Sequence, residues 1–319
     1  MAKLKDIKGS AIQYLAEDPV EYVGTWSSAS SVNQARSGVG SAGTQSANLM
    51  FGGPAPGGHG AKTELYDGST WTEVNDLNTP RASAGSMGTS TAAVYCGGRA
   101  SPTASLTASE NWNGTSWTEG NDINRSRYAV GNKGSGTQTA GLIAGGNQRF
   151  SPVTTPNYFA GTEEYDGTSW TEVNDLPSGL ESAGGIGTQT AAGLWGGYAG
   201  SYTNAGFLYD GTNWTSTTAV PITGGAYGSS GTTTDGILFG FFDNPASNAV
   251  GNTISWNGTA FTEQNDLSTA RYNGAFPKGS GDPSQVAIMA AGYSGTADVA
   301  NTEEWSFPPS TSTILQEGQ

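Results

Sequence analysis

The sequence predicts an all-β fold, a six-bladed β-propeller with four antiparallel strands in each blade. The first observation is a sequence repeat: segments of similar sequence occur six times in 319 residues. The fixed mark of each unit is an aromatic residue: Trp26, Trp71, Trp117, Trp170, Trp214 and Phe261. Neighbouring marks lie 45, 46, 53, 44 and 47 residues apart. The second is that each unit holds four short runs typical of strands, so the units must stack around an axis to cover their faces.

Each unit follows the same order of signals. The residues ten positions after the mark are Arg36, Arg81, Arg127, Leu180, Gly224 and Arg271. An apolar run that ends in glycine follows, as in AVYCGG, then a variable stretch, and then a strand such as EEYDGTSW that leads to the next mark. Asp-Gly and Asn-Gly pairs between aromatic runs favour tight hairpins. Because the arginines recur at one repeat position, we expect them to have a structural task in each blade, such as tying neighbouring blades.

The two ends of the array predict how the ring closes. The chain begins with a strand of the outermost type around Trp26, and EEWSF ends the array after the third strand of the sixth unit. We expect the N-terminal strand to complete the last blade; the alternative is that STSTI, 310–314, provides its outer strand. The propeller then covers residues 20–307, with an N-terminal anchoring segment at 1–19 and a C-terminal tail at 308–319.

The composition narrows the classes of partner. Lys and Arg number 13 against 27 Asp and Glu, which gives a formal net charge of −14. This balance argues against nucleic acid and anionic membranes as partners, since both select clustered basic residues. No apolar run approaches the roughly 20 residues that span a bilayer. The N-terminal segment lacks the continuous apolar stretch of a secretory signal, so we expect a protein made in a cytoplasm without membrane insertion.

The repeat wording resembles a known family. The doubled glycine, the Tyr-Asp strand and the tryptophan several residues later resemble Kelch repeats over about residues 22–307. The segments GTQTA and TEEYDGTSWTEVNDL, and the leader DIKGSAIQYLAEDP, are similar to the Kelch-like structural proteins of marine tailed bacteriophages. The fifth unit departs most, because TTAVPITGG lacks the arginine and the Asn-Asp pair and FGFF replaces the doubled glycine. The resemblance implies a virion protein, made in the host cytoplasm and present in multiple copies per particle.

Counting excludes the chemistry of the enzymatic Kelch relatives. The copper radical oxidases need two histidine ligands and a tyrosine cross-linked to a cysteine, and this chain has one histidine, His59, in the loop PAPGGHGAK. Cys96 ends the apolar run AVYC, and we expect a buried, inert thiol. DGTSW is one residue too short for the sialidase Asp-box. We therefore predict no catalytic residue, metal or cofactor, with a two-carboxylate glycan hydrolase as a remaining alternative.

Asn-Asp pairs recur between the outer strand of one unit and the inner strand of the next. They are Asn75-Asp76, Asn121-Asp122, Asn174-Asp175 and Asn265-Asp266. Such side chains hydrogen-bond local backbone and fix turns, which is the expected role. The alternative is a ring of carboxylates that gathers calcium, although the spacing matches no EF-hand ligand set.

The loops after the glycine-ended runs differ in length and carry aromatic residues. Because strands alternate in direction, these loops share a face with the Asn-Asp loops. The aromatic residues are Phe150, Tyr158, Phe159, Tyr198, Tyr202 and Tyr293. Tyrosines among Ser, Asn and Gly offer flat apolar faces with adaptable hydrogen bonds, and a rigid scaffold would hold them in place. We predict these six as ligand-binding residues; the alternative is loop drift without selection.

These observations lead to an expectation about function. We expect a non-enzymatic virion structural protein, associated with a tail or fibre, whose variable loops bind a bacterial surface glycan or an outer-membrane protein. Its two tails would attach it to other virion proteins. One alternative is a purely structural decoration or neck protein whose loops bind capsid or tail proteins, and a third is a glycan hydrolase.

Overall fold

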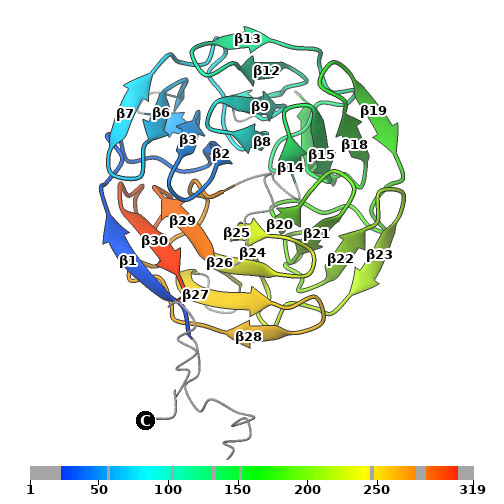
Figure 1. Ribbon diagram of the computed structural model, residues 1–319. Coiled ribbons are helices and arrows are strands. Elements are labelled where there is room, and N and C mark those ends of the chain that lie inside the picture. The colour runs from blue at the N-terminus through cyan, green and yellow to red at the C-terminus, as the bar shows by residue number, and fades with distance from the viewer. Residues whose placement is uncertain are drawn as a thin grey trace, which may run out of the picture.

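Six small antiparallel sheets stand in a ring, and the strands of each sheet lie side by side from the axis to the rim (Figure 1). Among the strands that the structure describes, four of these sheets have four, one has five and one has three. The computed structural model describes residues 23–55, 58–101, 104–130, 134–150, 153–244, 248–277 and 285–307. Every regular element in these ranges is a strand. The predicted six-bladed β-propeller is confirmed.

In blades 1 to 5 the four main strands follow chain order from the inside outward. Blade 1 comprises β2 (Gly40–Gly43), β3 (Asn48–Phe51), β6 (Thr63–Tyr66) and β7 (Trp71–Val74). Blade 2 comprises β8 (Gly85–Thr89), β9 (Ala92–Cys96), β12 (Ser109–Trp112) and β13 (Trp117–Glu119). Blade 3 comprises β14 (Ser135–Thr137), β15 (Ala140–Ala144), β18 (Thr162–Tyr165) and β19 (Trp170–Val173).

The second half of the ring follows the same plan. Blade 4 comprises β20 (Gly184–Gly187), β21 (Ala192–Trp195), β22 (Gly206–Tyr209) and β23 (Trp214–Thr217). Blade 5 comprises β25 (Gly228–Gly231), β26 (Gly236–Asp243), β27 (Asn248–Trp256) and β28 (Phe261–Glu263), with β24 (Gly224–Gly225) on the end of β26. Blade 6 comprises β29 (Val286–Ala290), β30 (Thr302–Ser306) and β1 (Thr25–Ala29), and on its inner side Ala275 bridges to Ala290.

The N-terminal strand closes the ring. β1 pairs antiparallel with β30 in an unbroken register from Thr25 opposite Ser306 to Ala29 opposite Thr302. The first of the two expected closures is therefore confirmed. The alternative strand at 310–314 lies outside the described residues, as do the segments 1–19 and 308–319.

The apolar core lies between neighbouring blades. Phe51 of blade 1 packs edge-on against Trp117 of blade 2, with ring centroids 4.8 Å apart. Phe239 of blade 5 makes the same contact with Trp26 of blade 6 at 4.9 Å. A single blade would leave both of its apolar faces exposed to water. Contacts with the two neighbouring blades cover these faces, which is why the blades are stable only as a ring.

The aromatic mark also makes a polar link to the preceding blade. In four blades its indole N–H donates, over 2.9–3.2 Å, to a threonine hydroxyl in the third strand of that blade: Trp26 to Thr253, Trp71 to Thr302, Trp117 to Thr63 and Trp214 to Thr162. In blade 5 the mark is Phe261, which has no N–H, and the residue at the threonine position of blade 4 is Gly206. Donor and acceptor are therefore absent together.

The doubled glycine is required by the loop of the next blade. Gly97 and Gly98 have φ angles of 69° and 86°. The Gly98 N–H donates to the carbonyl of Arg127 at 2.8 Å. A Cβ on Gly97 would lie 2.7 Å from that same oxygen. The glycine pair and the arginine of the following repeat thus meet in one contact between blades, which only glycine permits.

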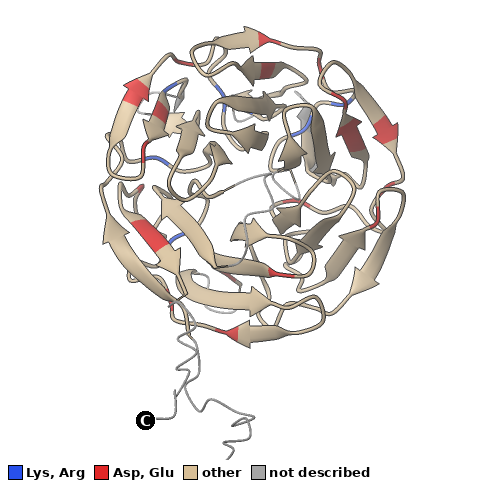
Figure 2. Ribbon diagram, viewed as in Figure 1, with Lys and Arg blue, Asp and Glu red and all other residues tan. Residues whose placement is uncertain are grey.

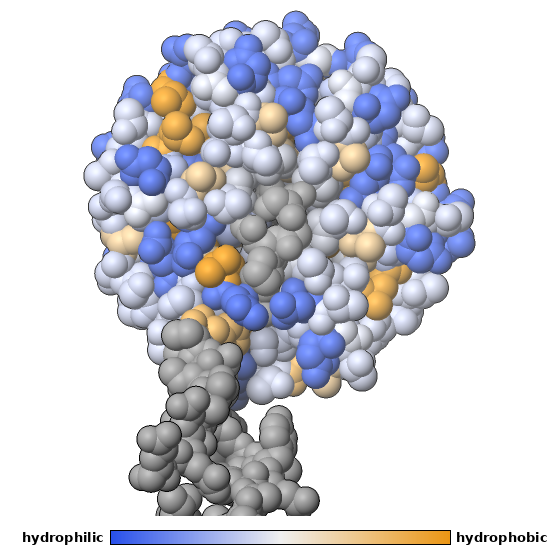
Figure 3. Space-filling view, viewed as in Figure 1, coloured by the Kyte–Doolittle hydropathy of each residue, from blue (hydrophilic) through white to orange (hydrophobic). Residues whose placement is uncertain are grey.

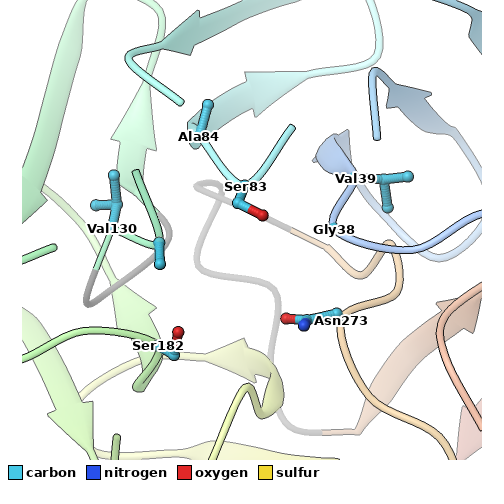
Figure 4. A pocket seen from close by; sticks show the side chains of 8 residues that line it. Gly38, Val39, Ser83, Ala84, Val130, Ser182 and Asn273 are labelled. Atoms are coloured by element: carbon cyan, nitrogen blue, oxygen red, sulfur yellow. The ribbon is translucent and has the colours of Figure 1, made fainter. Parts of the chain in front are cut away.

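A closed ring of six backbone hydrogen bonds surrounds the axis. Its members stand twelve residues after the aromatic marks: Gly38, Ser83, Ala129, Ser182, Ala226 and Asn273. Each N–H donates to the carbonyl of its counterpart in the preceding blade, over 2.5–3.5 Å. All six have φ between 47° and 63°, a conformation that costs a residue other than glycine roughly 1 kcal/mol. Ser83, Ser182 and Asn273 surround an axial cavity of about 40 Å³ (Figure 4).

The repeated arginines are buried and paired with glutamates. The pairs are Arg36–Glu64, Arg81–Glu110, Arg127–Glu163 and Arg271–Glu303, and all eight side chains are at most 2% exposed. The glutamates lie on β6, β12, β18 and β30, with the basic residues beside them (Figure 2). Each arginine sits in the loop that leaves one blade and is held by the third strand of the next. The expected structural task is therefore the tie between neighbouring blades.

The glutamate also holds the start of the same loop. In blade 2 the Oε2 of Glu110 accepts hydrogen bonds from the backbone N–H of Asn78 at 2.8 Å and from its side-chain amide at 3.0 Å. That amide donates a second bond to the carbonyl of Trp117 at 2.9 Å. One buried carboxylate thus holds both Asn78 and Arg81 in the loop that connects blade 1 to blade 2.

Blades 4 and 5 lack every part of this tie. At the arginine, glutamate and asparagine positions stand Leu180, Phe207 and Pro177 in blade 4, and Gly224, Ile254 and Pro221 in blade 5. Proline has no N–H to donate, so the lost acceptor leaves no orphaned donor there. All three positions differ together from those of the other blades. This is expected, because a buried charge without its partner is costly.

We predict that Arg81→Leu lowers the free energy of unfolding by about 3–5 kcal/mol, because the buried Glu110 carboxylate is left without its cation. The variant Asn78→Pro/Arg81→Leu/Glu110→Phe, which copies blade 4 into blade 2, should recover most of that loss. Urea unfolding followed by tryptophan fluorescence measures both values.

The exposed pair Lys62–Glu73 supplies the control. Its side chains are 40% and 53% exposed, so Lys62→Leu should leave the urea midpoint nearly unchanged, because solvent screens an exposed pair. A triple variant no more stable than Arg81→Leu would show that the three positions do not act as a set.

Candidate functional site

One face of the ring carries the loops between second and third strands. In blades 1 to 3 these loops form small hairpins: β4 (Pro54–Ala55) with β5 (Gly58–His59), β10 (Arg99–Ser101) with β11 (Ala104–Ser105), and β16 (Asn147–Phe150) with β17 (Val153–Tyr158). In blades 2 and 3 the bases of these hairpins pair with the loops that precede inner strands, Ala82 with Arg99 and Tyr128 with Asn147. In blade 6 Tyr293 pairs with Tyr272 in the same way. The variable loops and the loops after the outer strands therefore lie together near the axis.

Six aromatic rings form a continuous row on this face, across blades 3 to 6. We name it the aromatic arc: Tyr158, Tyr198, Tyr202, Phe242, Tyr272 and Tyr293. Successive ring centroids lie 5.4, 4.9, 5.2, 5.6 and 5.7 Å apart, with interplanar angles from 34° to 75°. These are the tilted and edge-to-face contacts that aromatic pairs prefer. All six side chains are half-buried, so the rings fix one another while part of each stays accessible.

The middle of the arc lines a pocket of about 240 Å³ between blades 4, 5 and 6. Its aromatic wall consists of Tyr198, Tyr202, Phe242 and Tyr272. Glu181 and Asn273 add a carboxylate and an amide to the lining. Gly225 completes it, since a Cβ there would lie only 3.1 Å from Cε1 of Tyr202. The pocket combines flat apolar surfaces with a few polar groups, as small-molecule sites do.

The pocket forms where the repeat departs from its pattern. In blade 5 Gly240 is followed by Phe241 and Phe242 instead of a second glycine. Phe241 is buried and stacks on Tyr227 at 4.5 Å, whereas Phe242 lines the pocket. At the repeat position of Gly225 the other units carry Ser37, Ala82, Tyr128, Glu181 and Tyr272. A missing side chain and an added ring together make this site.

Three tyrosines of the arc, Tyr158, Tyr202 and Tyr272, have a raised pKa. Burial, with a smaller effect of Tyr198, raises the pKa of Tyr158 to about 12. Burial likewise raises the pKa of Tyr202 and Tyr272. Near neutral pH these phenols are uncharged and present an O–H that can donate or accept a hydrogen bond.

The structure brings together four of the six residues predicted as ligand-binding. Tyr158, Tyr198, Tyr202 and Tyr293 all belong to the aromatic arc. The ring of Phe159 lies instead under two guanidinium groups, 4.1 Å from Arg125 and 4.4 Å from Arg127, and so belongs to the tie of blade 3. Phe150 ends β16, and its side chain lies outside the described part.

Sequence reasoning missed Phe242, Tyr272, Glu181 and Asn273. The signal for Phe242 was present, because FGFF was the clearest departure from the doubled glycine. The other three lie one or two residues after the arginine position of their repeats, in loops that the sequence indicated only as connections.

The Asn-Asp pairs make hydrogen bonds within the protein. The carboxylate of Asp76 accepts from the backbone N–H of Thr63 at 3.1 Å, and the side-chain amide of Asn75 donates to the carbonyl of Thr115 in the next blade at 2.8 Å. The Asp carboxylate thus binds the start of the third strand of its own blade and the Asn amide binds the next blade, so these bonds reach beyond the local turn expected from the sequence. Within the described ranges, no three His, Cys, Asp or Glu side chains are grouped as a metal site requires.

The two single residues considered for chemistry are placed as follows. Cys96 is buried, and burial raises its thiol pKa, which keeps the sulfur protonated. His59 ends β5, but its side chain is not among those described.

Polar and pale residues predominate on the face seen in Figure 3, where apolar residues form small separate groups. No helix with the length and hydropathy needed to cross a bilayer occurs in the described ranges. No family model matches this sequence, and a search of the curated proteins finds no match.

We predict that the pKa of Tyr158 can be read from phenolate absorbance. The difference between the native protein and Tyr158→Phe should show one phenol that titrates near pH 12, above its ordinary value of 10.0. Because the folded pKa is raised, the stability that the neutral phenol contributes is present below pH 10 and is lost as the pH rises toward 12. Rapid pH jumps record the absorbance before unfolding, and a difference centred on pH 10 would contradict the prediction.

Proposed function

We propose that this protein is a non-enzymatic, Kelch-type structural protein of a tailed-bacteriophage virion, and that its aromatic arc binds the surface of the host cell. The ligand is a glycan or an outer-membrane protein. The observation that carries the proposal is the row of six half-buried aromatic rings on a single face, beside a pocket. The terminal segments, outside the described residues, attach the ring to other virion proteins.

The repeat wording supports the Kelch and virion parts of this proposal. The doubled glycine and the tryptophan mark each make a contact between neighbouring blades. The residues that resemble Kelch repeats therefore stabilise the packing of blades in the ring. The resemblance to phage structural proteins supports the proposal that the protein is part of a virion. Multiple copies on one particle would turn weak binding at each face into firm attachment.

The lining of the pocket favours binding over hydrolysis. Glycoside hydrolysis ordinarily uses two carboxyl groups that flank the scissile bond. Glu181 is the one carboxylate among the lining residues that the structure describes. A purely structural role in the particle remains the rival, and cell binding separates the two.

We predict saturable binding of the fluorescently labelled full-length chain to host cells, with virus as competitor. Tyr202→Ala should weaken this binding by at least about tenfold, because truncation of a central aromatic contact typically costs more than 1 kcal/mol. Glu172→Gln, at an exposed position on the outer strand β19, should leave it unchanged.

The rival makes the opposite prediction. If the structural role is correct, no host cell binds the labelled chain, and deletion of the protein from the virus abolishes particle assembly. Release of reducing sugar from host envelopes would instead support the hydrolase.

A further inference from the structure

We propose that the pocket between blades 4, 5 and 6 is a subsite for a single uncharged pyranose ring. The inference rests on the proposed function, because the glycan that supplies this ring is the host-surface ligand. Its basis is the composition of the lining, which places four aromatic rings beside a carboxylate, an amide and a hydroxyl.

The aromatic wall suits the apolar face of a sugar. A pyranose presents several C–H groups on one side of its ring, and the neighbouring oxygens give these hydrogens partial positive charge. The face of an aromatic ring carries partial negative charge and attracts them. Tyr202 and Phe242, with centroids 5.2 Å apart and an angle of 34°, form a shallow platform, and Tyr272 stands across Phe242 at 72°. One flat ligand ring can lie against two walls at once.

The polar groups suit the hydroxyls on the rim of the sugar. Glu181 contributes acceptors, the amide of Asn273 both donors and acceptors, and Ser182 a hydroxyl. The hydroxyls of a sugar can hydrogen-bond to these groups in place of water, which a purely apolar ligand cannot do. A ligand that carries hydroxyls around an apolar face satisfies both parts of the lining.

The size and charge of the pocket narrow the ligand further. A volume of about 240 Å³ suits one sugar ring and not a chain. Glu181 is the one formally charged residue among the described lining, and the whole chain has a net charge of −14. An anionic sugar is therefore disfavoured, and the preferred ligand is a neutral hexose or 6-deoxyhexose.

The pocket owes its space to Gly225, which gives a sharp test. Its backbone lies outside the left-handed region, so alanine is conformationally allowed there, but the new Cβ would lie 3.1 Å from both Cε1 of Tyr202 and the carbonyl oxygen of Ser182. Gly225→Ala therefore narrows the pocket without removing any lining side chain.

The experiment is calorimetric titration of the full-length chain with the methyl glycosides of glucose, galactose, mannose and rhamnose. Methyl glucuronide and tetramethylammonium serve as the anionic and cationic contrasts. We expect at least one neutral glycoside to bind at millimolar concentration, and Tyr202→Ala and Gly225→Ala each to weaken it by at least about tenfold. Tyr202→Phe, which keeps the ring, should cost less than about threefold. Glu172→Gln should cost nothing.

The outcomes separate this inference from the proposed function. If host cells bind the chain but no neutral glycoside does, or only tetramethylammonium does, the sugar subsite is wrong and the proposed function stands with another ligand. If a neutral glycoside binds in the pocket but no host cell binds the chain, the subsite stands and the proposed function fails. Glycoside binding that Tyr202→Ala and Gly225→Ala leave unchanged in folded protein overturns the subsite.

Discussion

Closure of the ring is the constraint on which the rest of this structure depends. Six peptide groups, one from each crossing loop, hydrogen-bond in a circle around the axis, and each sits in a left-handed conformation that five of them adopt at a cost. No member of the circle can form its bonds until both neighbours are in place. The pairing of β1 with β30 therefore completes more than one sheet, because it brings the last member of the circle, Asn273, beside the first, Gly38.

The ties between blades divide the ring into a regular part and an altered part. Blades 1, 2, 3 and 6 hold their crossing loops with a buried Arg–Glu pair, whereas blades 4 and 5 replace the pair with apolar residues or glycine. The aromatic pocket lies at this alteration. The loop into blade 5 has no arginine, and its residues Gly224 and Gly225 carry no side chains. Aromatic rings from three blades line the pocket at this position. Function is thus proposed where the repeat is least faithful to its own pattern.

The sequence was sufficient for the fold because the contacts between blades recur from unit to unit: the arginine ten residues after the mark and the doubled glycine each occur in four of the six units. The offset of ten residues from mark to arginine and the doubled glycine each had a single structural reason, so repetition revealed them. The partner of the arginine could also have been inferred, since Glu64, Glu110, Glu163 and Glu303 are present in the same four units as the arginines. The departure of blades 4 and 5 as a set strengthens that reading.

The site could be predicted only in part, for a physical reason. Tyrosines in variable loops pointed to Tyr158, Tyr198, Tyr202 and Tyr293, but their order around the face depends on where each loop bends. Glu181 and Asn273 enter the pocket because the left-handed turn at the axial circle directs the segment before the inner strand toward it. Phe159 is an aromatic residue of a variable loop, as the prediction required, but its ring packs against the guanidinium groups of Arg125 and Arg127 and not in the arc. Such directions are set by tertiary contacts that no local pattern encodes.

Native-state hydrogen exchange at the axial circle tests the central claim most directly. The account predicts that the amides of Gly38, Ser83, Ala129 and Ser182 exchange only through global unfolding, with one shared free energy equal to that from urea. Trp26→Ala, which weakens the closing strand, should lower that shared value for all four together. Different and lower free energies for each amide would contradict it, because the blades would then open independently and the circle would not constrain the ring.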